Sequence, residues 1–544
     1  MIAKVVLAVS TAMLIRSIVS LHAYSGKNTP PMYGDFEAQR HWQEIVVNLP
    51  IADWYTNTTD NDLMYWGLDY PPLTAYHTYI VGRVAQYIDP KFVALHESRG
   101  LTDDSHKHFM RSTVLIADLL LYLPAILICC RMISSKNWFK CDERLSNLFM
   151  AVAVLYPGQI LIDNGHFQYN NISLGLAVMA IVFVLRNQNI VGAIFFTLSL
   201  NYKQMELYHA LPFFVYLLAN CFKYTSKKMG FVDGLKRLTK LGVVVLLTFA
   251  VLWLPWLGST QSALQVLHRI FPLARGVFED KVSNVWCIVN VVLPLRERFS
   301  NDQMAVVCLT CTLASLLPSL VHLFRQPNQK TFLLSLVNSS LAFFLFSFQV
   351  HEKSILLATL PITLYFPLDP LLCLWFLQVA TFSMLPLLVR DGLLLAFIAL
   401  NAFYLLLIKL LTEIPSHRKE KVTESKIDVL RLARIQPIHS NSTLFDKSKL
   451  WLFYLSLCGQ IVLLICLVWV PPPVISKLFM IEVVDESDGC GGKFSTIIVS
   501  EQFAGKSLLQ RHRLVNTALA EELKTIHAFS QKTFTPEQWA NEKK

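Results

Sequence analysis

Two acidic motifs flanked by aromatic residues lie in one polar segment, directly after an apolar N-terminal run. The first reads Gly-Asp-Phe-Glu-Ala-Gln-Arg-His-Trp at 34–42, and the second reads Trp-Gly-Leu-Asp-Tyr-Pro-Pro-Leu at 66–73. A positioned carboxylate can remove the proton from a hydroxyl group as that group attacks. Aromatic rings are typical of the boundary between lipid and water. The pattern therefore predicts an active site for chemistry on a sugar that a lipid presents.

Asp35 is the first candidate for the general base. It follows the turn signal Pro30-Pro31 and precedes an amphipathic stretch from Phe36 to Leu49. When a sugar is transferred from a lipid phosphate, the phosphate departs as a stable anion and needs no general acid. One carboxylate that takes the proton of the acceptor hydroxyl is therefore the minimum catalyst. The alternative role for Asp35 is to cap the helix that follows, which Asp does readily. Both roles can coexist.

The second motif gives a second candidate carboxylate, Asp69. Pro71-Pro72 stiffens the chain after it and keeps Tyr70 extended. A rigid acidic turn of this kind can hold sugar hydroxyls. Trp66 and Tyr70 either belong to the same site or serve as interfacial anchors.

Two later polar segments carry clusters of ionisable residues. The loop 268–281 contains three cations and two carboxylates with interleaved aromatic residues, and the turn 348–353 places His351, Glu352 and Lys353 between two apolar runs. Cations there would stabilise the charge that develops on a leaving phosphate, and ionisable residues at membrane depth indicate function. The competing roles are a solvated loop for the first segment and a water-facing hairpin cap for the second.

Two shorter turns also place polar groups beside apolar runs. The turn 163–170 contains His166, and the turn 202–205 contains Lys203. Either turn could line a cavity. For Lys203 the alternative is a side chain that snorkels to the membrane interface.

The composition is that of a polytopic membrane protein. The chain has 544 residues, of which 54% are hydrophobic and 16% charged, and its mean hydropathy is +0.44. About thirteen apolar runs approach the length of roughly 20 residues that spans a bilayer. We expect the first run to be a retained helix rather than a cleaved signal peptide. The runs are 3–21, 112–130, 145–162, 171–186, 190–202, 207–222, 241–257, 305–324, 331–350, 353–367, 371–389, 392–411 and 450–470.

Basic residues predict the orientation. The loops 131–144, 223–240 and 412–449 are rich in Lys and Arg and fall on one side in the alternating count, which makes that side cytosolic. The long loops 22–111 and 258–304 then face a lumen, together with the turns at His166, Tyr202 and His351. The net charge of +10 therefore reflects topology rather than nucleic-acid binding. The eleven Cys residues show neither a disulfide framework nor zinc-ligand spacing.

These motifs resemble those of the endoplasmic-reticulum dolichyl-phosphate-glucose-dependent glucosyltransferases of asparagine-linked glycan assembly. The resemblance covers residues 1 to about 473 and includes Asp-Asn-Gly-His-Phe-Gln-Tyr-Asn at 163–170, His-Arg-Ile-Phe-Pro at 268–272, Phe-Glu-Asp-Lys-Val at 278–282 and Phe-Gln-Val-His-Glu-Lys at 348–353. It implies an all-α GT-C fold that crosses the endoplasmic-reticulum membrane many times, with lumenal catalytic loops. It also implies inverting transfer of glucose from dolichyl-phosphate-glucose onto a dolichyl-pyrophosphate oligosaccharide, with no cofactor or required metal and with Asp35 as general base.

Two sister groups of this family add the first and the second glucose. The motifs Gly-Asp-Phe-Glu-Ala-Gln-Arg-His-Trp and Trp-Gly-Leu-Asp-Tyr match the first-glucose group, which forms an α-1,3 linkage on Man9GlcNAc2-PP-dolichol. The second-glucose group tends to carry Thr-Asp-Phe-Glu-Val-His-Arg-Asn-Trp and remains the alternative. A transporter of lipid-linked sugars would carry its charges near the bilayer midplane on broken helices, whereas here they gather in lumenal loops. We therefore predict Asp35 as the catalytic base and the following substrate-binding residues: Asp69, Glu37, Arg40, His41, Trp66, Tyr70, His166, His268, Arg269, Glu279, Lys281, His351, Glu352 and Lys353.

The last seventy or so residues have a different character. After Pro471-Pro472-Pro473 the composition becomes that of a soluble protein, with strands expected at 481–485 and 494–500 and a helix at 505–524. The motifs Asp-Gly-Cys-Gly at 488–491, Arg-His-Arg-Leu-Val-Asn at 511–516 and Thr-Pro-Glu-Gln-Trp at 535–539 resemble the BolA family of small cytosolic or mitochondrial proteins. This resemblance implies a small α+β fold, monothiol glutaredoxin partners and shared iron–sulphur ligation by Cys490 and His527. The alternatives are a loop Cys and a packed His.

We expect a multispanning glucosyltransferase domain at 1–473, a junction at 474–480 and a truncated BolA-like domain at 481–544. The junction lacks both the last membrane helix of the first family and the first helix of the second. By the helix count the tail lies in the lumen, where a cytosolic glutaredoxin is absent. We therefore interpret the tail as a fusion of two neighbouring genes or a degenerate segment rather than as half of a bifunctional protein.

Overall fold

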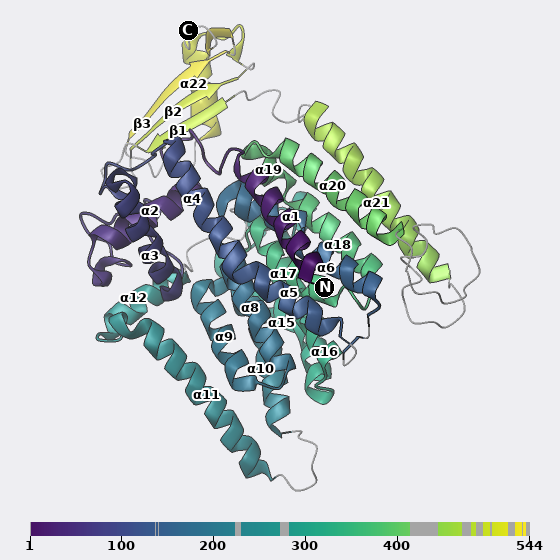
Figure 1. The fold of residues 1–544 in the computed structure, drawn as a ribbon. Coiled ribbons are helices and arrows are strands. Elements are labelled where there is room, and N and C mark those ends of the chain that lie inside the picture. The colour runs from purple at the N-terminus through teal and green to yellow at the C-terminus, as the bar shows by residue number, and fades with distance from the viewer. Residues whose placement is uncertain are drawn as a thin grey trace. The chain divides into compact units, whose positions relative to one another are not determined.

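The computed structural model describes residues 2–135, 138–139, 141–222, 230–271, 282–413, 444–469, 480–485, 493–500, 503–519, 528–535 and 537–539. The chain divides into two compact units, Met1–Leu450 and Trp451–Lys544. The described part of the first unit consists of helices joined by loops, with no strand, and the second unit combines a helix that begins in the first unit with a small sheet (Figure 1).

The helices of the first unit vary widely in length because some are continuous apolar spans and others are short elements in polar loops. Two π-helical segments, η3 (Asp118–Tyr122) and η4 (Leu161–Phe167), interrupt the spans, and 3₁₀ turns include η5 (Gln204–Glu206) and η7 (Glu352–Ser354). The α-helices are α1 (Ile2–Ser20), α2 (Asp35–Asn48), α3 (Pro72–Ile88), α4 (Asp104–Ala117), α5 (Leu123–Ile133), α6 (Glu143–Val154), α7 (Pro157–Ile160), α8 (Asn170–Leu185), α9 (Asn189–Tyr202), α10 (Leu207–Phe222), α11 (Phe231–Trp253), α12 (Thr260–Ile270), α13 (Val285–Val292), α14 (Leu295–Arg298), α15 (Asn301–Arg325), α16 (Gln329–Phe346), α17 (Ile355–Tyr365), α18 (Pro370–Ser383), α19 (Leu385–Arg390), α20 (Leu394–Glu413) and the start of α21 (Leu444–Trp469).

Each predicted apolar run overlaps a helix of the structure. Seven helices in the described part of the chain are long and apolar enough to cross a membrane, and four further apolar helices are shorter. Seven of the thirteen predicted runs therefore coincide with helices that meet both the length and the hydropathy of a membrane span within the described residues. The seven are Ala3–Ser20, Asp104–Ile133, Glu143–Phe167, Phe231–Trp256, Asn301–Arg325, Gln329–Phe346 and Leu394–Glu413.

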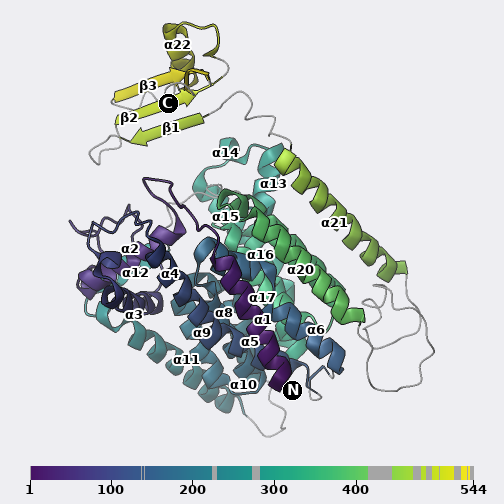
Figure 2. The same ribbon diagram turned by 45° about the horizontal axis from the view of Figure 1, so that its top comes forward.

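A lobe outside the spanning helices carries the two acidic motifs. Figures 1 and 2 show α2, α3 and α12 gathered at one side of the bundle. We call the segments 35–101 and 254–271 the loop lobe. Its core is rich in aromatic residues, including Trp42, Trp54, Tyr55, Phe92 and Trp256. These large side chains bury enough apolar area to give the lobe a core of its own.

Buried polar contacts tie the two π-helical segments together. The Asp118 carboxylate in η3 lies 3.2 Å from the Arg16 guanidinium of α1 and accepts a hydrogen bond from Asn164 of η4 at 2.9 Å. Asp163, also in η4, accepts hydrogen bonds from Asn170 Nδ2 and Asn171 N, each at 2.7 Å. A buried polar group is costly unless it is paired, so these contacts fix η4 against α1, η3 and α8.

The second unit contains a three-stranded sheet in the order β1-β2-β3. Strand β1 (Met480–Asp485) is antiparallel to β2 (Lys493–Val499), which is parallel to β3 (Ala528–Phe534). Helix α22 (Leu508–Ala518) packs Val515 near Ile498 and Phe503. The two predicted strands and the helix are confirmed, although the described helix begins later and ends earlier than the expected 505–524. The third strand was not predicted.

Candidate active site

The carboxylate of Asp35 is the meeting point of three polar segments. Asp35 is the first residue of α2, and its Oδ2 lies 2.9 Å from His166 Nε2 and accepts a hydrogen bond from Gln168 Nε2 at 2.6 Å. The Lys353 ammonium forms an ion pair with the same oxygen. His166 and Gln168 come from the turn 163–170, and Lys353 comes from the turn 348–353. The sequence predicted that all three segments carry functional groups, and the structure brings them together.

A tight turn delivers Asp35 to this place. Gly26 has φ +74, and a side-chain carbon added there would meet the Tyr33 carbonyl oxygen. Gly34, the residue before α2, has φ +153, and a Cβ on it would lie 2.9 Å from the Gly26 backbone. Two glycines therefore allow the segment to fold back on itself before the helix begins.

The charge of Asp35 is set by opposing effects. Burial alone would raise the pKa of this carboxyl, but the positive charge of Lys353 opposes burial, and the pKa of Asp35 lies well below its usual value. The group is therefore ionised at neutral pH. It is ready to accept a proton once Lys353 is engaged elsewhere.

A cavity of about 380 Å³ opens beside Asp35. Part of its wall is apolar, with Leu174, Leu207 and Phe343 among the described lining residues. Its polar wall joins residues from both sequence motifs and from the later turns. Six predicted site residues line it, namely Asp35, Trp66, Asp69, Tyr70, His351 and Lys353.

Side chains of α12 and α2 hold the second motif in place through the backbone carbonyls of that motif. Arg269 Nη2 donates to the Gly67 carbonyl at 2.9 Å, and Arg269 Nε donates to the Leu68 carbonyl at 3.3 Å. Trp42 Nε1 donates to the Trp66 carbonyl at 2.8 Å. Arg269 thus fixes the position of the acidic turn, and it is not among the described residues that line the cavity.

A second lysine contributes to the cavity. Lys203 follows α9, donates a hydrogen bond to Asn170 Oδ1 and lies 5.1 Å from the centre of the Tyr70 ring. Burial, together with the nearby charge of Lys353, lowers the pKa of Lys203 to about 8. Two ammonium groups in a partly apolar cavity favour an anion there. The turn 202–205 therefore lines the cavity, one of the roles considered from the sequence.

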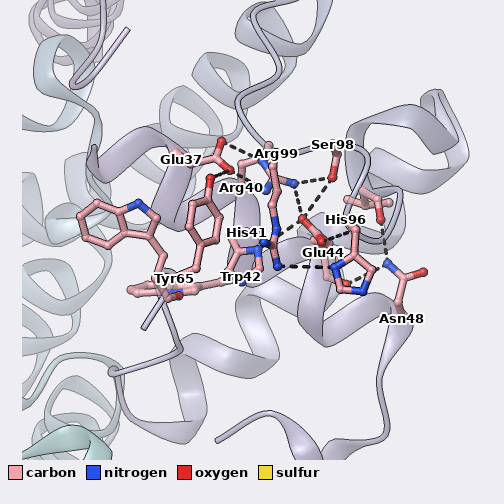
Figure 3. A network of polar contacts seen from close by, with 12 residues as sticks. Glu37, Arg40, His41, Trp42, Glu44, Asn48, Tyr65, His96, Ser98 and Arg99 are labelled. Carbon is pink, nitrogen blue, oxygen red and sulfur yellow. Dashed lines mark hydrogen bonds and ion pairs between the residues drawn. The ribbon is translucent and has the colours of Figure 1, made fainter. Parts of the chain in front are cut away.

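Three other predicted residues lie in a separate network inside the loop lobe. Figure 3 shows Arg40 between the carboxylates of Glu37 and Glu44. The guanidinium lies 2.6 Å from Glu37 Oε1 and 2.7 Å from Glu44 Oε2, and His41 Nδ1 lies 3.3 Å from Glu44 Oε2. Glu37, Arg40 and His41 are buried. Within the described part of the chain, they lie in the packing of α2 rather than along the cavity wall.

This network should make the stability of the lobe depend on pH. Burial alone would raise the pKa of Glu44, but its contacts with His41 and Arg40 lower it from 4.5 to about 2. A depressed carboxyl pKa contributes stability that is complete above the unfolded value and is lost as pH falls through the folded value. The contribution of Glu44 should therefore fade between about pH 4.5 and 2.

We expect Glu44→Gln to lower the thermal midpoint of the purified protein at neutral pH, because Arg40 then keeps only one of its two carboxylate partners. Below about pH 4.5 the difference between the variant and the unchanged protein should shrink. Thermal unfolding in detergent across this range measures both effects. The matched control is Glu97→Gln, an exposed residue in the same lobe. Equal midpoints for Glu44→Gln and Glu97→Gln would contradict the assignment.

The remaining predicted residues fall in three places. His268 is exposed at the end of α12, and Glu352 is half-buried in η7. Glu279 and Lys281 lie outside the described residues, as do Cys490 and His527 of the second unit. Among the residues that the structure describes, no group of three or more His, Cys, Asp or Glu side chains is placed to hold a metal ion.

Gln168 was not singled out from the sequence, and Lys203 was considered as a residue that could line a cavity but was not predicted as a site residue. The available signal was their position within polar turns that separate apolar runs, a signal that marks the turn but not the individual side chain.

A multispanning helical protein with an ionised carboxylate and two lysines around a partly apolar cavity has the features of a membrane-embedded transferase. Residues 8–484 match the ALG6, ALG8 glycosyltransferase family. The chain belongs to this family and is a glycosyltransferase, as the sequence predicted. The predicted fold class, a multispanning helical glycosyltransferase with a small α+β segment at its end, is also confirmed.

Several relatives are similar over most of their length. A probable dolichyl pyrophosphate Man9GlcNAc2 alpha-1,3-glucosyltransferase from Drosophila melanogaster is 59% identical over 393 residues, which cover 72% of this chain and 81% of the relative. The Dictyostelium discoideum protein of the same name is 43% identical over 490 residues, covering 88% and 91%. The Pongo abelii dolichyl pyrophosphate Man9GlcNAc2 alpha-1,3-glucosyltransferase is 44% identical over 462 residues, covering 84% and 88%.

The second unit has its own relatives. Residues 480–538 match the BolA-like protein family, as predicted. A Bol-like protein from Babesia bovis is 46% identical, covering 13% of this chain and 85% of that protein, with a TM-score of 0.12.

A further solved structure matches most of the chain. The match to the archaeal oligosaccharyltransferase AglB from Archaeoglobus fulgidus covers 74% of this chain and 54% of AglB, at 14% identity and a TM-score of 0.36.

Proposed function

We propose that this chain transfers the first glucose from dolichyl-phosphate-glucose onto dolichyl-pyrophosphate-linked Man9GlcNAc2, forming an α-1,3 linkage with inversion at the glucose C1. The observation that carries the proposal is the Asp35 carboxylate, held by Lys353, His166 and Gln168 beside a cavity with cationic and apolar walls. The names of the relatives support the acceptor and the linkage.

The proposed reaction has one bond-forming step. The acceptor hydroxyl gives its proton to Asp35 while its oxygen bonds to the glucose C1, and the bond from C1 to the phosphate oxygen breaks. The departing lipid phosphate gains negative charge, which Lys353 and Lys203 stabilise because both ammonium groups lie at the cavity. Lys353 pairs with Asp35 in the structure, so an arriving phosphate would compete for this cation and free the carboxylate.

The apolar wall suits the lipid part of the donor. Leu356 and Leu357 of α17 and Phe343 of α16 are among its described residues. Isoprenoid chains gain free energy when such surface covers them. A water-soluble nucleotide sugar would gain nothing from this wall, and we therefore favour a dolichyl-linked donor.

We further propose that the site faces the lumen of the endoplasmic reticulum. Asp35, His166, Lys203 and Lys353 come from four polar segments that the basic loops assign to one side of the membrane. Asp35, Lys203 and Lys353 line one cavity and His166 contacts Asp35, which supports a common face for these segments. A lumenal face is also where a glycan-building lipid would present its sugar to these loops.

The experiment is a transfer assay in membranes with two acceptors. Dolichyl-phosphate-glucose should glucosylate lipid-linked Man9GlcNAc2, and the same lipid that already carries one glucose should stay unchanged. Transfer to the monoglucosylated lipid alone would make the chain a second-glucose enzyme. Movement of the lipid-linked sugar across the membrane without transfer would make it a transporter.

We expect the BolA-like tail to be dispensable for glucosyl transfer. Truncation after Pro473 keeps α21 whole and removes the strands β1, β2 and β3. At roughly 65 residues, the tail is small enough that its own core contributes little stability. Transfer activity per folded molecule in isolated membranes should therefore match that of the full chain.

Two results would contradict this view of the tail. One is an inactive truncated protein beside an active full chain. The other is a glutaredoxin-bridged iron–sulphur cluster assembled by the full chain through Cys490 and His527, detected by its absorption spectrum and lost in Cys490→Ser.

A further inference from the structure

His166 lies between two carboxylates. Its Nε2 is 2.9 Å from Asp35 Oδ2, and its Nδ1 makes a short hydrogen bond with Asp391 Oδ2. The side chains of His166 and Asp391 are 1% and 2% exposed, whereas that of Asp35 is 22% exposed. The three side chains thus form a line from the cavity into the protein interior, and only Asp35, at one end, lines the cavity.

The backbone around Asp391 holds it at the inner end of this line. Asp391 follows α19, and Gly392 adopts φ +73, a conformation that ends helices and is suited to glycine. Gly392 N donates to the Val389 carbonyl at 3.0 Å, and Leu393 N donates to the Leu388 carbonyl at 2.8 Å. The chain then enters α20. Asp391 is therefore fixed by a helix end rather than by a freely moving loop.

His166 is also held from its own backbone. Arg111 of α4 donates to the carbonyls of Asn164 and Gly165, each at 2.6 Å, and Ser25 N donates to the His166 carbonyl at 3.0 Å. These contacts fix the end of η4 that carries the imidazole. A ring held at its backbone and at Nδ1 can present only Nε2 to Asp35.

Three charged groups contact the imidazole at its two nitrogens. Asp391 contacts Nδ1, Asp35 contacts Nε2, and Lys353 Nζ lies 3.3 Å from Nε2 while pairing with Asp35. Arg111 stays on the backbone of the same turn. With Lys353 in place, one ammonium bridges the Asp35 carboxylate and the imidazole. Once the Lys353 ammonium turns to a phosphate, a proton can be shared between Asp35 Oδ2 and His166 Nε2.

We propose that Asp391 is a positioning residue that acts through His166, and that it lets His166 share the proton that Asp35 removes from the acceptor. Asp391 accepts the Nδ1 proton of His166, so Nε2 carries a lone pair, and the Lys353 ammonium bridges this lone pair and Asp35 Oδ2 until the phosphate draws the ammonium away. The acceptor O–H bond breaks, its proton reaches Asp35 Oδ2, and the proton is shared with Nε2. The Asp391 carboxylate stabilises the positive charge that develops on the ring. A carboxylate behind an imidazole has this role in hydrolytic triads. The inference rests on the proposed function of Asp35 as general base.

The first test replaces Asp391 by Asn. We expect kcat per folded molecule to fall about tenfold to hundredfold, less than for loss of the base itself. The KM for dolichyl-phosphate-glucose should stay within about twofold, because Asp391 does not touch substrate. Asp391→Glu keeps the charge and should recover part of kcat. The matched control is Asp369→Asn, which also removes an ion-paired carboxylate at a helix end, 3.1 Å from Lys449, and should keep normal kcat.

The second test asks whether Asp391 acts through His166. The variants His166→Gln and Asp391→Asn are compared with the double variant, all as monodisperse protein in detergent. If Asp391 acts only through the imidazole, the double variant should be no slower than His166→Gln alone. Multiplied losses would overturn the proposal. So would a normal kcat in Asp391→Asn, or a loss in Asp391→Glu as large as in Asp391→Asn.

The outcome with Asp35→Asn separates this inference from the proposed function. An inactive Asp35→Asn beside a fully active Asp391→Asn would leave Asp35 as the base and remove only the proton sharing. An active Asp35→Asn would contradict the assignment of the base, and the proton sharing would fall with it.

Discussion

Replacing Asp35 by Asn should lower the rate of glucosyl transfer by about a hundredfold to ten-thousandfold while leaving expression and membrane insertion intact. The amide keeps the shape of the side chain but removes its ability to take a proton. It can still accept a hydrogen bond from Gln168, which lies 2.6 Å from Asp35 Oδ2. The rate is measured as glucosylated lipid formed per folded molecule in isolated membranes.

The matched control for this variant is Asp103→Asn. Asp103 is exposed and caps α4, where its side chain accepts a hydrogen bond from Ser105 N, a role that Asn can also fill. Its activity should equal that of the unchanged protein. Near-normal transfer by Asp35→Asn would contradict the assignment of the base, and attention would move to Asp69 or Glu279.

Replacing Lys353 by Met should reduce kcat by about a hundredfold to a thousandfold, the usual loss when one group that stabilises developing charge is removed. Met keeps most of the length of the side chain and removes its charge. Lys203 remains in the cavity and should sustain residual phosphate binding. We expect Lys203→Met, His351→Ala and Arg269→Ala also to impair turnover.

Lys353→Met should have a second consequence that a neutral change elsewhere would not produce. The ammonium of Lys353 is one cause of the depressed pKa of Asp35, so its loss raises that pKa. As pH falls, the variant should therefore lose activity at a higher pH than the unchanged protein. Lys91→Met, at an exposed lysine of the loop lobe, is the control and should change neither kcat nor the pH profile. Unchanged kinetics in Lys353→Met would remove this residue from the mechanism.

The sequence identified much of the cavity because its motifs mark turns between apolar runs. Asp35, Asp69 and Lys353 come from three such turns and line one cavity in the structure. The same motif that holds Asp35 also contains Glu37 and Arg40, which are buried in the network of Figure 3. A motif does not distinguish side chains that face a cavity from those that pack the helix behind it, because both lie on one short helix and differ only in direction.

Asp391 could not be predicted from one sequence. It is separated from His166 by 225 positions, and the pair forms only because α19 ends beside η4. Local pattern carries no information on such a contact. The sequence also could not predict the number of spanning helices. Apolar runs indicate where helices lie, but they do not show whether each helix is long enough to span a membrane. The thirteen runs overlap helices, and within the described residues seven helices are both long and apolar enough to span.

The most direct test of the central claim is transfer by the purified full chain in vesicles with one acceptor and three alternative donors. With lipid-linked Man9GlcNAc2, we expect product only from dolichyl-phosphate-glucose, and none from dolichyl-phosphate-mannose or a nucleotide-linked glucose. The product should carry one glucose in α-1,3 linkage, with the configuration at C1 inverted relative to the donor. Transfer from the nucleotide sugar, or retention of the donor configuration, would contradict a single carboxylate base acting on a lipid-phosphate donor.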